Sequence, residues 1–292
     1  MTTIDTAIIP VAGLGTRMLP ATKEQPKEML PVPIHDPRHG LVFKPFLQLI
    51  FEQLFDTGIR RFIFVVGRGK RIIEDHFTPD WSYTEYLRNR GKEREASLLE
   101  DFYKKVEASI ITWVNQPHPL GFGDAVQRAA QLAQGPFIVH AGDIAILGSP
   151  NPLAMLIQTY QELQPDALIL VREVENPSHY GVVVAAEPKP TPDNIIRVKR
   201  VIEKPAKPPS KLAITAVYVF TPSILKALEK TPLGPRGEKE LTDAIQKLID
   251  SKADVRALVL DSDKYKFIDI GRPDAYIDAI GFLAGKRSLI PR

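Results

Sequence analysis

The sequence predicts an α/β fold, in which a mixed but mostly parallel sheet carries helices on both faces. Short runs of strongly apolar residues, typical of buried strands, recur through the first half of the chain, and segments with helical spacing separate them. Strands that alternate with helices form mostly parallel sheets, because each helix returns the chain to the edge where the previous strand began. The 292 residues are enough for a large core.

The predicted elements of the first half follow in order. Strands are predicted at residues 6–11, 61–66, 110–114 and 137–140. Helices are predicted at residues 43–54, 125–133 and 153–163, with Phe43 as the first apolar position of the first helix and Pro45 in its first turn. The segment near 81–107 is charged and has few strong apolar anchors, so we expect a helical excursion at the surface.

The second half consists mainly of predicted strands and turns. Strands are predicted at residues 167–171, 181–185, 195–202 and 213–220, a proline-rich hairpin tip at 187–192, and a packing helix at 273–283. Neither proline cluster resembles a linker between domains. We therefore expect a single domain over residues 1–292, with a strand-rich part near 172–220.

The composition excludes several classes of protein. Hydrophobic residues make up 44% of the chain and charged residues 25%, as in soluble globular proteins. The net charge of +3 gives no support for a nucleic-acid partner, and no apolar run is long enough to cross a membrane. The N-terminus does not resemble a signal peptide, so we expect a cytoplasmic protein. Because cysteine is absent, thiolate catalysis and iron–sulfur clusters are excluded, and any metal must bind oxygen or imidazole.

A glycine-rich loop follows the first predicted strand. Gly13 and Gly15 expose backbone N–H groups that can surround a phosphate chain, and Arg17 adds a positive charge. The dinucleotide-binding pattern requires a third glycine where the chain has Met18, which disfavours a dehydrogenase, and the P-loop pattern is absent. A Gly-x-Gly alone is equally consistent with a tight turn that binds nothing. The six histidines show no metal-binding spacing, and we expect no catalytic role for them.

The residues around this loop carry a longer resemblance. Residues 12–23 and 26–31 closely resemble the signature of bacterial-type UTP–glucose-1-phosphate uridylyltransferases, within the wider sugar-phosphate nucleotidyltransferase family. Further similar segments are residues 72–77, 116–125, 180–183, 203–205, 241–245 and 267–271, with Asp143 and Glu238, so the resemblance covers nearly the whole chain. It implies the Rossmann-like sheet of nucleotide-diphospho-sugar transferases and a homo-oligomer, either a dimer or a tetramer.

The resemblance also implies a reaction. An oxygen of glucose 1-phosphate attacks the α-phosphorus of UTP, giving UDP-glucose and pyrophosphate. Ala12, Gly13 and Gly15 are similar to the family's nucleotide-binding loop, and Arg17 and Lys27 to its catalytic basic residues. Phosphoryl transfer of this kind requires mainly positioning and neutralisation of charge, which suits a lysine at the α-phosphate.

Two aspartates are candidates for a metal site. Asp143 follows the strand at 137–140, and Asp269 follows the apolar-leaning run 265–268. Ligands of open α/β sheets bind at such strand ends, and two carboxylates with substrate phosphates fit Mg²⁺. The resemblance assigns both aspartates to the metal. Gly142 departs from the family's usual Leu-Pro-Asp or Leu-Ala-Asp, so we expect an altered loop around an unaltered ligand.

Gln116 and Gly121 are similar to the family's base-binding residues. A glutamine amide offers a donor and an acceptor, and it can rotate to suit cytosine as well as uracil. We therefore expect the backbone near Gly121, whose polarity is fixed, to select the base. Thymine presents the same edge as uracil, so a dTTP-dependent glucose-1-phosphate thymidylyltransferase is the alternative enzyme.

The strand-rich part near 172–220 is similar to the family's sugar-binding part. Gly181 and Glu203 are expected to bind sugar hydroxyls, and Lys204 the sugar phosphate. Adjacent residues of a strand point to opposite faces, so the strand must bend at Glu203 or Lys204. Lys211 and Ala216 stand where the family has asparagine and glycine, so the sugar preference can differ.

A non-catalytic sensor of nucleotide sugars is the alternative from another functional class. It would keep the glycine-rich loop but would not need the complete set of charged groups. Lys27, Asp143 and Asp269 are all present, which favours an enzyme.

Overall fold

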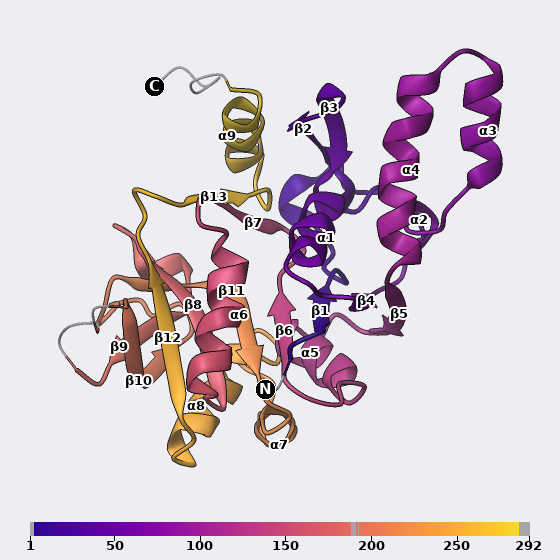
Figure 1. Cartoon of the computed structure of the whole chain (residues 1–292). Coiled ribbons are helices and arrows are strands. Elements are labelled where there is room, and N and C mark those ends of the chain that lie inside the picture. The colour runs from indigo at the N-terminus through magenta and orange to yellow at the C-terminus, as the bar shows by residue number, and fades with distance from the viewer. Residues whose placement is uncertain (1–2, 188–190, 192, 286–292) are drawn as a thin grey trace.

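A computed structural model describes residues 3–187, 191 and 193–285, and a nine-stranded sheet forms its centre (Figure 1). The strands in spatial order are β5 (Ile110–Asn115), β4 (Arg61–Val66), β1 (Thr6–Pro10), β6 (Phe137–His140), β11 (Leu212–Phe220), β8 (Ala167–Glu173), β12 (Val255–Leu260), β10 (Ile195–Ile202) and β9 (Val182–Ala185). The first four are parallel to one another. Among the rest, β12 runs parallel to β8, and the other pairings are antiparallel.

Both faces of this sheet are buried, because alternate residues of each strand point to opposite sides. In β1, Ile9 packs into one core cluster with α1 (Phe46–Asp56) and α6 (Pro152–Leu163). Ile8 packs into the other with α5 (Phe122–Ala130), α7 (Ile224–Glu229) and α8 (Leu241–Asp250). The prediction of a mixed α/β sheet with helices on both faces is therefore confirmed.

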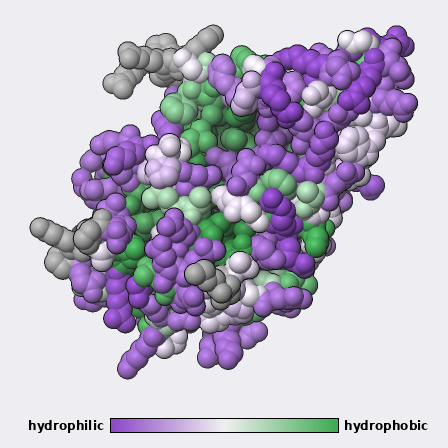
Figure 2. Space-filling model, in the orientation of Figure 1, coloured by the Kyte–Doolittle hydropathy of each residue, from purple (hydrophilic) through white to green (hydrophobic). Residues whose placement is uncertain are grey.

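The remaining helices lie at the edges of the molecule. They are α2 (Arg71–His76), α3 (Trp81–Asn89), α4 (Glu93–Glu107) and α9 (Pro273–Leu283). α3 and α4 pack against each other and extend away from the sheet, and hydrophilic side chains dominate the surface over them (Figures 1 and 2). None of the helices within the described ranges is long and apolar enough to span a membrane.

Two antiparallel strand pairs lie outside the main sheet. β2 (Pro31–Asp36) pairs with β3 (Gly40–Pro45), and β7 (Ile144–Leu147) pairs with β13 (Lys266–Asp269). The prediction that Phe43 begins the first helix is wrong, because Phe43 lies in β3 and is 67% exposed. Pro45 has an extended backbone and caps α1, so the helix begins only at Phe46.

Two other predicted boundaries differ from the structure or fall outside it. The helix predicted at 125–133 begins at Phe122 and ends at Ala130, because Gly121 caps its start with a φ of 97°. β9 and β10 pair as an antiparallel hairpin. Most of its predicted tip, residues 188–190 and 192, lies outside the described residues.

Candidate active site

Two adjoining cavities lie at the carboxyl ends of the parallel strands, where open α/β sheets bind their ligands. The glycine-loop cavity, about 460 Å³, is lined by Gly13, Gly15, Arg17, Lys27, Gln116, Gly121, Asp143, Ala216 and Gly271, among others. The second cavity, about 810 Å³, is called the basic cavity for its Arg17, Arg172, Lys204, Arg236 and Arg272, although the acidic Glu173, Glu175, Glu238 and Asp269 also line it. Arg17 lines both, so the predicted catalytic and metal residues gather around their junction.

The glycine-rich loop presents bare backbone to the first cavity. A methyl group added at Gly13 would meet no other atom within 4 Å, so the backbone there is open to a ligand. Gly15 has a φ of 65°, which favours glycine, and its carbonyl accepts a hydrogen bond from the Thr22 hydroxyl at 2.8 Å. This contact fixes the loop in the turn that leads to Arg17.

Lys27 and Asp143 form a partly buried ion pair inside the glycine-loop cavity. Their Nζ and Oδ2 atoms are 2.6 Å apart, and the side chains are 14% and 20% exposed. Burial alone lowers the pKa of Lys27, but the Asp143 carboxylate and the nearby Glu28 outweigh it and hold that pKa above its ordinary value. Burial alone raises the pKa of Asp143, but Lys27 holds it below its ordinary value. Both groups therefore carry their charges.

A second, more deeply buried ion pair involves the residue next to Lys27, and no pattern in the sequence predicts it. Lys70 Nζ lies 3.1 Å from Glu28 Oε2, with side-chain exposures of 8% and 3%. Burial raises the pKa of Glu28, against the opposing effect of Lys70 and Lys27. Glu28 follows Lys27 directly in the chain, so the buried Glu28–Lys70 pair anchors the segment that carries Lys27.

Asp143 and Asp269 are brought together by the pairing of β7 with β13. The Ile270 N–H donates to the Asp143 carbonyl at 3.1 Å, directly beside Asp269. A methyl group at Gly271 would lie 3.0 Å from Asp269 Oδ1, 3.0 Å from Arg17 Nη2 and 3.5 Å from Asp143 Oδ2, so all three groups converge there. Burial, together with the neighbouring Asp143 charge, raises the pKa of Asp269. Two carboxylates facing one space are what a divalent cation would stabilise.

The described part of the chain nevertheless holds no complete protein metal site. Across residues 3–187, 191 and 193–285, no three His, Cys, Asp or Glu side chains come together as metal ligands. The two carboxylates therefore fit a cation that takes its other ligands from substrate phosphates and water, as Mg²⁺ commonly does. Gly142 is closely packed, because a methyl group there would lie 2.5 Å from Val11 Cγ1; the expectation of an altered loop stays a prediction.

Gln116 follows β5 and lines the glycine-loop cavity with its side-chain amide held in place. Its Nε2 donates to the Gly121 carbonyl at 3.1 Å and to Asp124 Oδ2 at 2.8 Å. The expectation that this amide can turn either way is therefore wrong. Gly121 has no room for a side chain, because a methyl group there would lie 2.9 Å from the Lys239 backbone.

The sugar-side residues predicted from the sequence also lie together. β10 ends at Ile202, so Glu203 and Lys204 follow the strand, and Lys204 has a φ of 38°. This turn lets both side chains reach the same side, and their charged groups are 2.9 Å apart. A methyl group at Gly181 would lie 3.3 Å from Glu203 Oε2, so the Gly181 backbone faces that carboxylate.

Three residues that the sequence analysis did not select complete this cluster. The Thr242 hydroxyl donates to Glu203 Oε2 at 2.8 Å. Arg236 lies 3.6 Å from Glu203 Oε1 and also pairs with Glu240. Thr242 belongs to the segment 241–245 that carries the resemblance, which is the signal that could have found it. Arg236 and Glu240 lie outside the residues that carry the resemblance.

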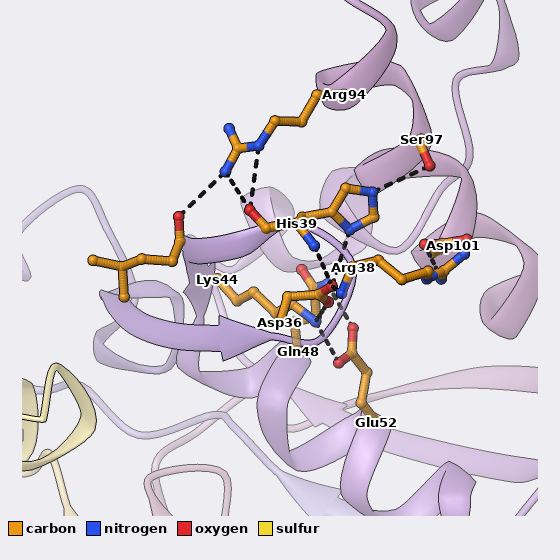
Figure 3. Close-up of polar contacts among 10 residues, drawn as sticks. Asp36, Arg38, His39, Lys44, Gln48, Glu52, Arg94, Ser97 and Asp101 are labelled. Atoms are coloured by element: carbon orange, nitrogen blue, oxygen red, sulfur yellow. Dashed lines mark hydrogen bonds and ion pairs between the residues drawn. The ribbon is translucent and has the colours of Figure 1, made fainter.

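A separate polar cluster ties the β2–β3 hairpin to α4 (Figure 3). His39 lies between Asp36, at 3.0 Å, and the Ser97 hydroxyl, at 3.2 Å, and Arg94 donates to the His39 carbonyl at 2.7 Å. The order Ser–His–Asp resembles a hydrolase triad, but Ser97 lies within a helix whose N–H groups are already bonded and cannot stabilise an oxyanion. We assign the cluster a structural role, in line with the expectation that no histidine is catalytic.

Comparison with known proteins agrees with this geometry. The family model described as nucleotidyl transferase matches residues 6–286. A UTP–glucose-1-phosphate uridylyltransferase of Bacillus subtilis (strain 168) is 40% identical over 246 residues, which are 83% of this chain and 79% of that protein. A crystal structure of a UDP-glucose pyrophosphorylase complexed with UDP-glucose is 29% identical, has a TM-score of 0.82, and is matched over 98% of this chain and 100% of that one. A UTP-bound UGPase from Acinetobacter baumannii is 31% identical, with a TM-score of 0.80 and coverage of 95% and 92%. The chain therefore belongs to the nucleotidyl transferase family, among the UTP–glucose-1-phosphate uridylyltransferases.

Proposed function

We propose that this enzyme transfers a uridylyl group from UTP to glucose 1-phosphate, giving UDP-glucose and pyrophosphate. The observation that carries the proposal is the charged Lys27–Asp143 pair in the glycine-loop cavity, which adjoins the basic cavity at Arg17. One cavity has a bare glycine backbone suited to a nucleoside triphosphate, and the other has cationic side chains suited to a sugar phosphate. The names of the relatives support the same substrates.

In this mechanism the glycine-rich loop binds the triphosphate. Gly13 and Gly15 offer backbone N–H groups, and Arg17 adds charge near the phosphates that leave. An oxygen of the sugar phosphate forms a bond to the α-phosphorus, the bond between the α-phosphorus and the bridging oxygen breaks, and its electron pair leaves with pyrophosphate. Lys27 stabilises the charge that develops at the α-phosphate, and Asp143 orients its ammonium group.

Asp143 and Asp269 would hold Mg²⁺ in this proposal. Their convergence on one space and the raised pKa of Asp269, caused by burial and by the charge of Asp143, support a cation between them. When bound, Mg²⁺ would neutralise negative charge on the reacting phosphates. Asp143 would then serve two purposes, because it also holds Lys27 in place.

The sugar phosphate would bind in the basic cavity. Lys204 supplies a positive charge for the phosphate, and Glu203 and the Gly181 backbone are suited to sugar hydroxyls. Glu203 already has Thr242 as a donor, which leaves its other oxygen to exchange partners when a ligand enters.

The experiment that tests the proposal is pyrophosphate release across a matrix of substrates. UTP, dTTP, CTP and ATP would each be combined with glucose 1-phosphate, galactose 1-phosphate and glucosamine 1-phosphate, with Mg²⁺ or with a chelator. We expect the highest kcat/KM for UTP with glucose 1-phosphate and no turnover with the chelator. Preference for dTTP would identify the thymidylyltransferase alternative, which the names of the relatives do not favour. Tight binding of UDP-glucose without turnover would support the sensor.

A further inference from the structure

Gln116 is held by a side chain that the proposed mechanism does not use, Asp124 in the first turn of α5. Gln116 Nε2 has two hydrogens, and both have partners, namely Asp124 Oδ2 at 2.8 Å and the Gly121 carbonyl at 3.1 Å. A carboxylate and a carbonyl can only accept hydrogen bonds. Reversing the amide would therefore bring Oε1 against two acceptors and remove the donor that each accepts from Gln116.

Asp124 is itself fixed and kept ionised. Arg128, one helical turn further along α5, donates from Nε to the same Oδ2 at 2.8 Å. Burial by itself raises the pKa of Asp124, but the hydrogen bonds from Arg128 and Gln116 hold it below its ordinary value. The carboxylate thus stays an acceptor at neutral pH, and the chain of contacts runs from Arg128 through Asp124 to Gln116.

The consequence concerns which atom of Gln116 faces the cavity. Gln116 is 6% exposed and lines the glycine-loop cavity, and with Nε2 turned toward Asp124 and Gly121, Oε1 is the amide atom left for a ligand. Uracil and thymine carry a hydrogen on N3 and can donate to this oxygen. Cytosine has a lone pair on N3 and needs a donor, which the held amide does not offer.

We infer that Asp124 is a positioning residue that makes Gln116 select bases with an N3–H group, and so rejects cytosine. The inference rests on the proposed function, because it places a pyrimidine base against Gln116. It replaces the expectation that the backbone near Gly121 alone selects the base. It makes no distinction between UTP and dTTP, which present the same N3–H.

The test compares base selectivity in Asp124→Ala, Asp124→Asn and wild type. We would measure kcat/KM for UTP, dTTP and CTP at saturating glucose 1-phosphate. In Asp124→Ala one hydrogen of Nε2 loses its partner and the amide can turn, so the ratio of UTP to CTP should fall about tenfold, the effect of one buried hydrogen bond. Asp124→Asn keeps an oxygen that can accept from Gln116 and Arg128, so it should retain most of the ratio. The ratio of UTP to dTTP should stay constant in both.

Controls separate positioning from a general structural effect. Gln131→Ala, an exposed change just beyond the end of α5, should leave every ratio unchanged. A purely structural role for Asp124 would lower the rates with UTP and CTP equally, and an unchanged ratio in folded Asp124→Ala would overturn the inference. If thermal unfolding shows that Asp124→Ala does not fold, Asp124→Ser, whose hydroxyl is too short to replace the contact, is measured against the same criterion.

A binding measurement distinguishes failure of this inference from failure of the proposed function. Isothermal titration calorimetry would give the affinities of wild type and Asp124→Ala for UTP and for CTP with Mg²⁺. If no substrate pair releases pyrophosphate but wild type prefers UTP and Asp124→Ala loses that preference, the inference stands and the proposed function fails. Equal binding of UTP and CTP by wild type would overturn the inference whatever the turnover.

Discussion

The two cavities of the site are built in different ways. In the glycine-loop cavity, Lys27 and Asp143 are largely buried and pair with each other, with exposures of 14% and 20%, whereas Arg17, which lines both cavities, is exposed. In the basic cavity, Lys204 and Arg236 are about half exposed, at 44% and 50%. Both of these cations contact Glu203, which also accepts a hydrogen bond from Thr242.

This difference indicates a division of labour. Removing one partner of a buried ion pair strongly destabilises the folded protein, because the other charge stays buried without compensation. The geometry of such a pair is therefore fixed before a ligand binds. Exposed ion pairs are worth little, and water or a ligand can replace one partner at low cost. We therefore expect the glycine-loop cavity to govern turnover and choice of base, and the basic cavity to govern affinity for the sugar phosphate. The first two predictions below test this division, and the other two test the stability of the sheet that carries both cavities, from the largest expected effect to the smallest.

The largest effect is expected from Asp143→Asn. The change keeps the shape of the side chain but removes the charge that orients Lys27 and that would help to hold Mg²⁺. Loss of electrostatic stabilisation at a reacting phosphate reduces kcat by about 10² to 10³. The measurement is pyrophosphate release at saturating substrates, with thermal unfolding to check the fold. Asp278→Asn, on the exposed side of α9, is the matched control and should behave as wild type. Near-normal turnover in Asp143→Asn would contradict the mechanism.

Several features of this site could be predicted from the sequence, because they depend on residues that are close together in the chain. The strands before Gly13 and Asp143 are marked by continuous apolar runs, and the loop residues follow them directly. The bend that lets Glu203 and Lys204 act together also followed from the alternation of side chains along a strand. These features depend on neighbouring residues, so a single sequence is enough to predict them.

Contacts between distant segments were not predictable in the same way. Glu28 and Lys70 are 42 residues apart, and neither position has a pattern that requires a buried partner. Gln116 and Asp124 are only eight residues apart, but their contact depends on how α5 begins at Gly121. Phe43 fits the helical spacing of α1 by coincidence, because the extended Pro45 separates it from the helix. In each case the contact or the helix boundary depends on the tertiary structure, and the spacing of residues in the sequence does not determine it.

The second prediction contrasts the lysines of the two cavities. Lys204→Ala should mainly raise the KM for glucose 1-phosphate, by about 5- to 150-fold for a lost charged hydrogen bond, because its half-exposed side chain acts in binding. Lys27→Ala should mainly lower kcat, because its charge acts on the transition state. Initial rates over both substrate concentrations separate these effects. The opposite pattern would mean that the two cavities do not divide the work as their burial indicates.

The third prediction concerns the stability of the folded protein in acid, and it depends on His140. His140 is fully buried at the end of β6, and burial lowers its pKa from 6.5 to about 4, despite the opposing effects of the Ala141 carbonyl and Asp143. As the pH falls from 6.5 to 4, His140 becomes protonated in the unfolded chain but stays largely neutral in the folded protein. The free energy of unfolding should therefore fall by about 3 kcal/mol over this range through His140 alone.

His140→Leu tests this by removing the group that titrates. Its unfolding free energy, measured by chemical denaturation at several pH values, should decline less steeply between pH 6.5 and 4 than that of wild type. His76, whose pKa burial also lowers to about 4, remains in both proteins, so some decline persists. His35→Gln, at an exposed position in β2, is the control and should keep the wild-type slope. An unchanged slope in His140→Leu would show that His140 does not set this acid sensitivity.

The smallest effect is expected from Ala216→Gly in β11, the strand that joins the two halves of the sheet. Ala216 has a φ of 56° at an irregular register between Ile214 and Tyr218. This left-handed backbone costs a non-glycine residue roughly 1–2 kcal/mol, whereas the greater freedom of glycine in the unfolded chain costs about 0.5–1 kcal/mol. The folded state should therefore gain about 0.5–1 kcal/mol, measured by chemical denaturation at pH 7. Ala213→Gly, in the same strand without a positive φ, should lose stability instead. If the two variants lost stability equally, the backbone at Ala216 would carry no strain, and the methyl group would be retained for its packing against the cavity wall.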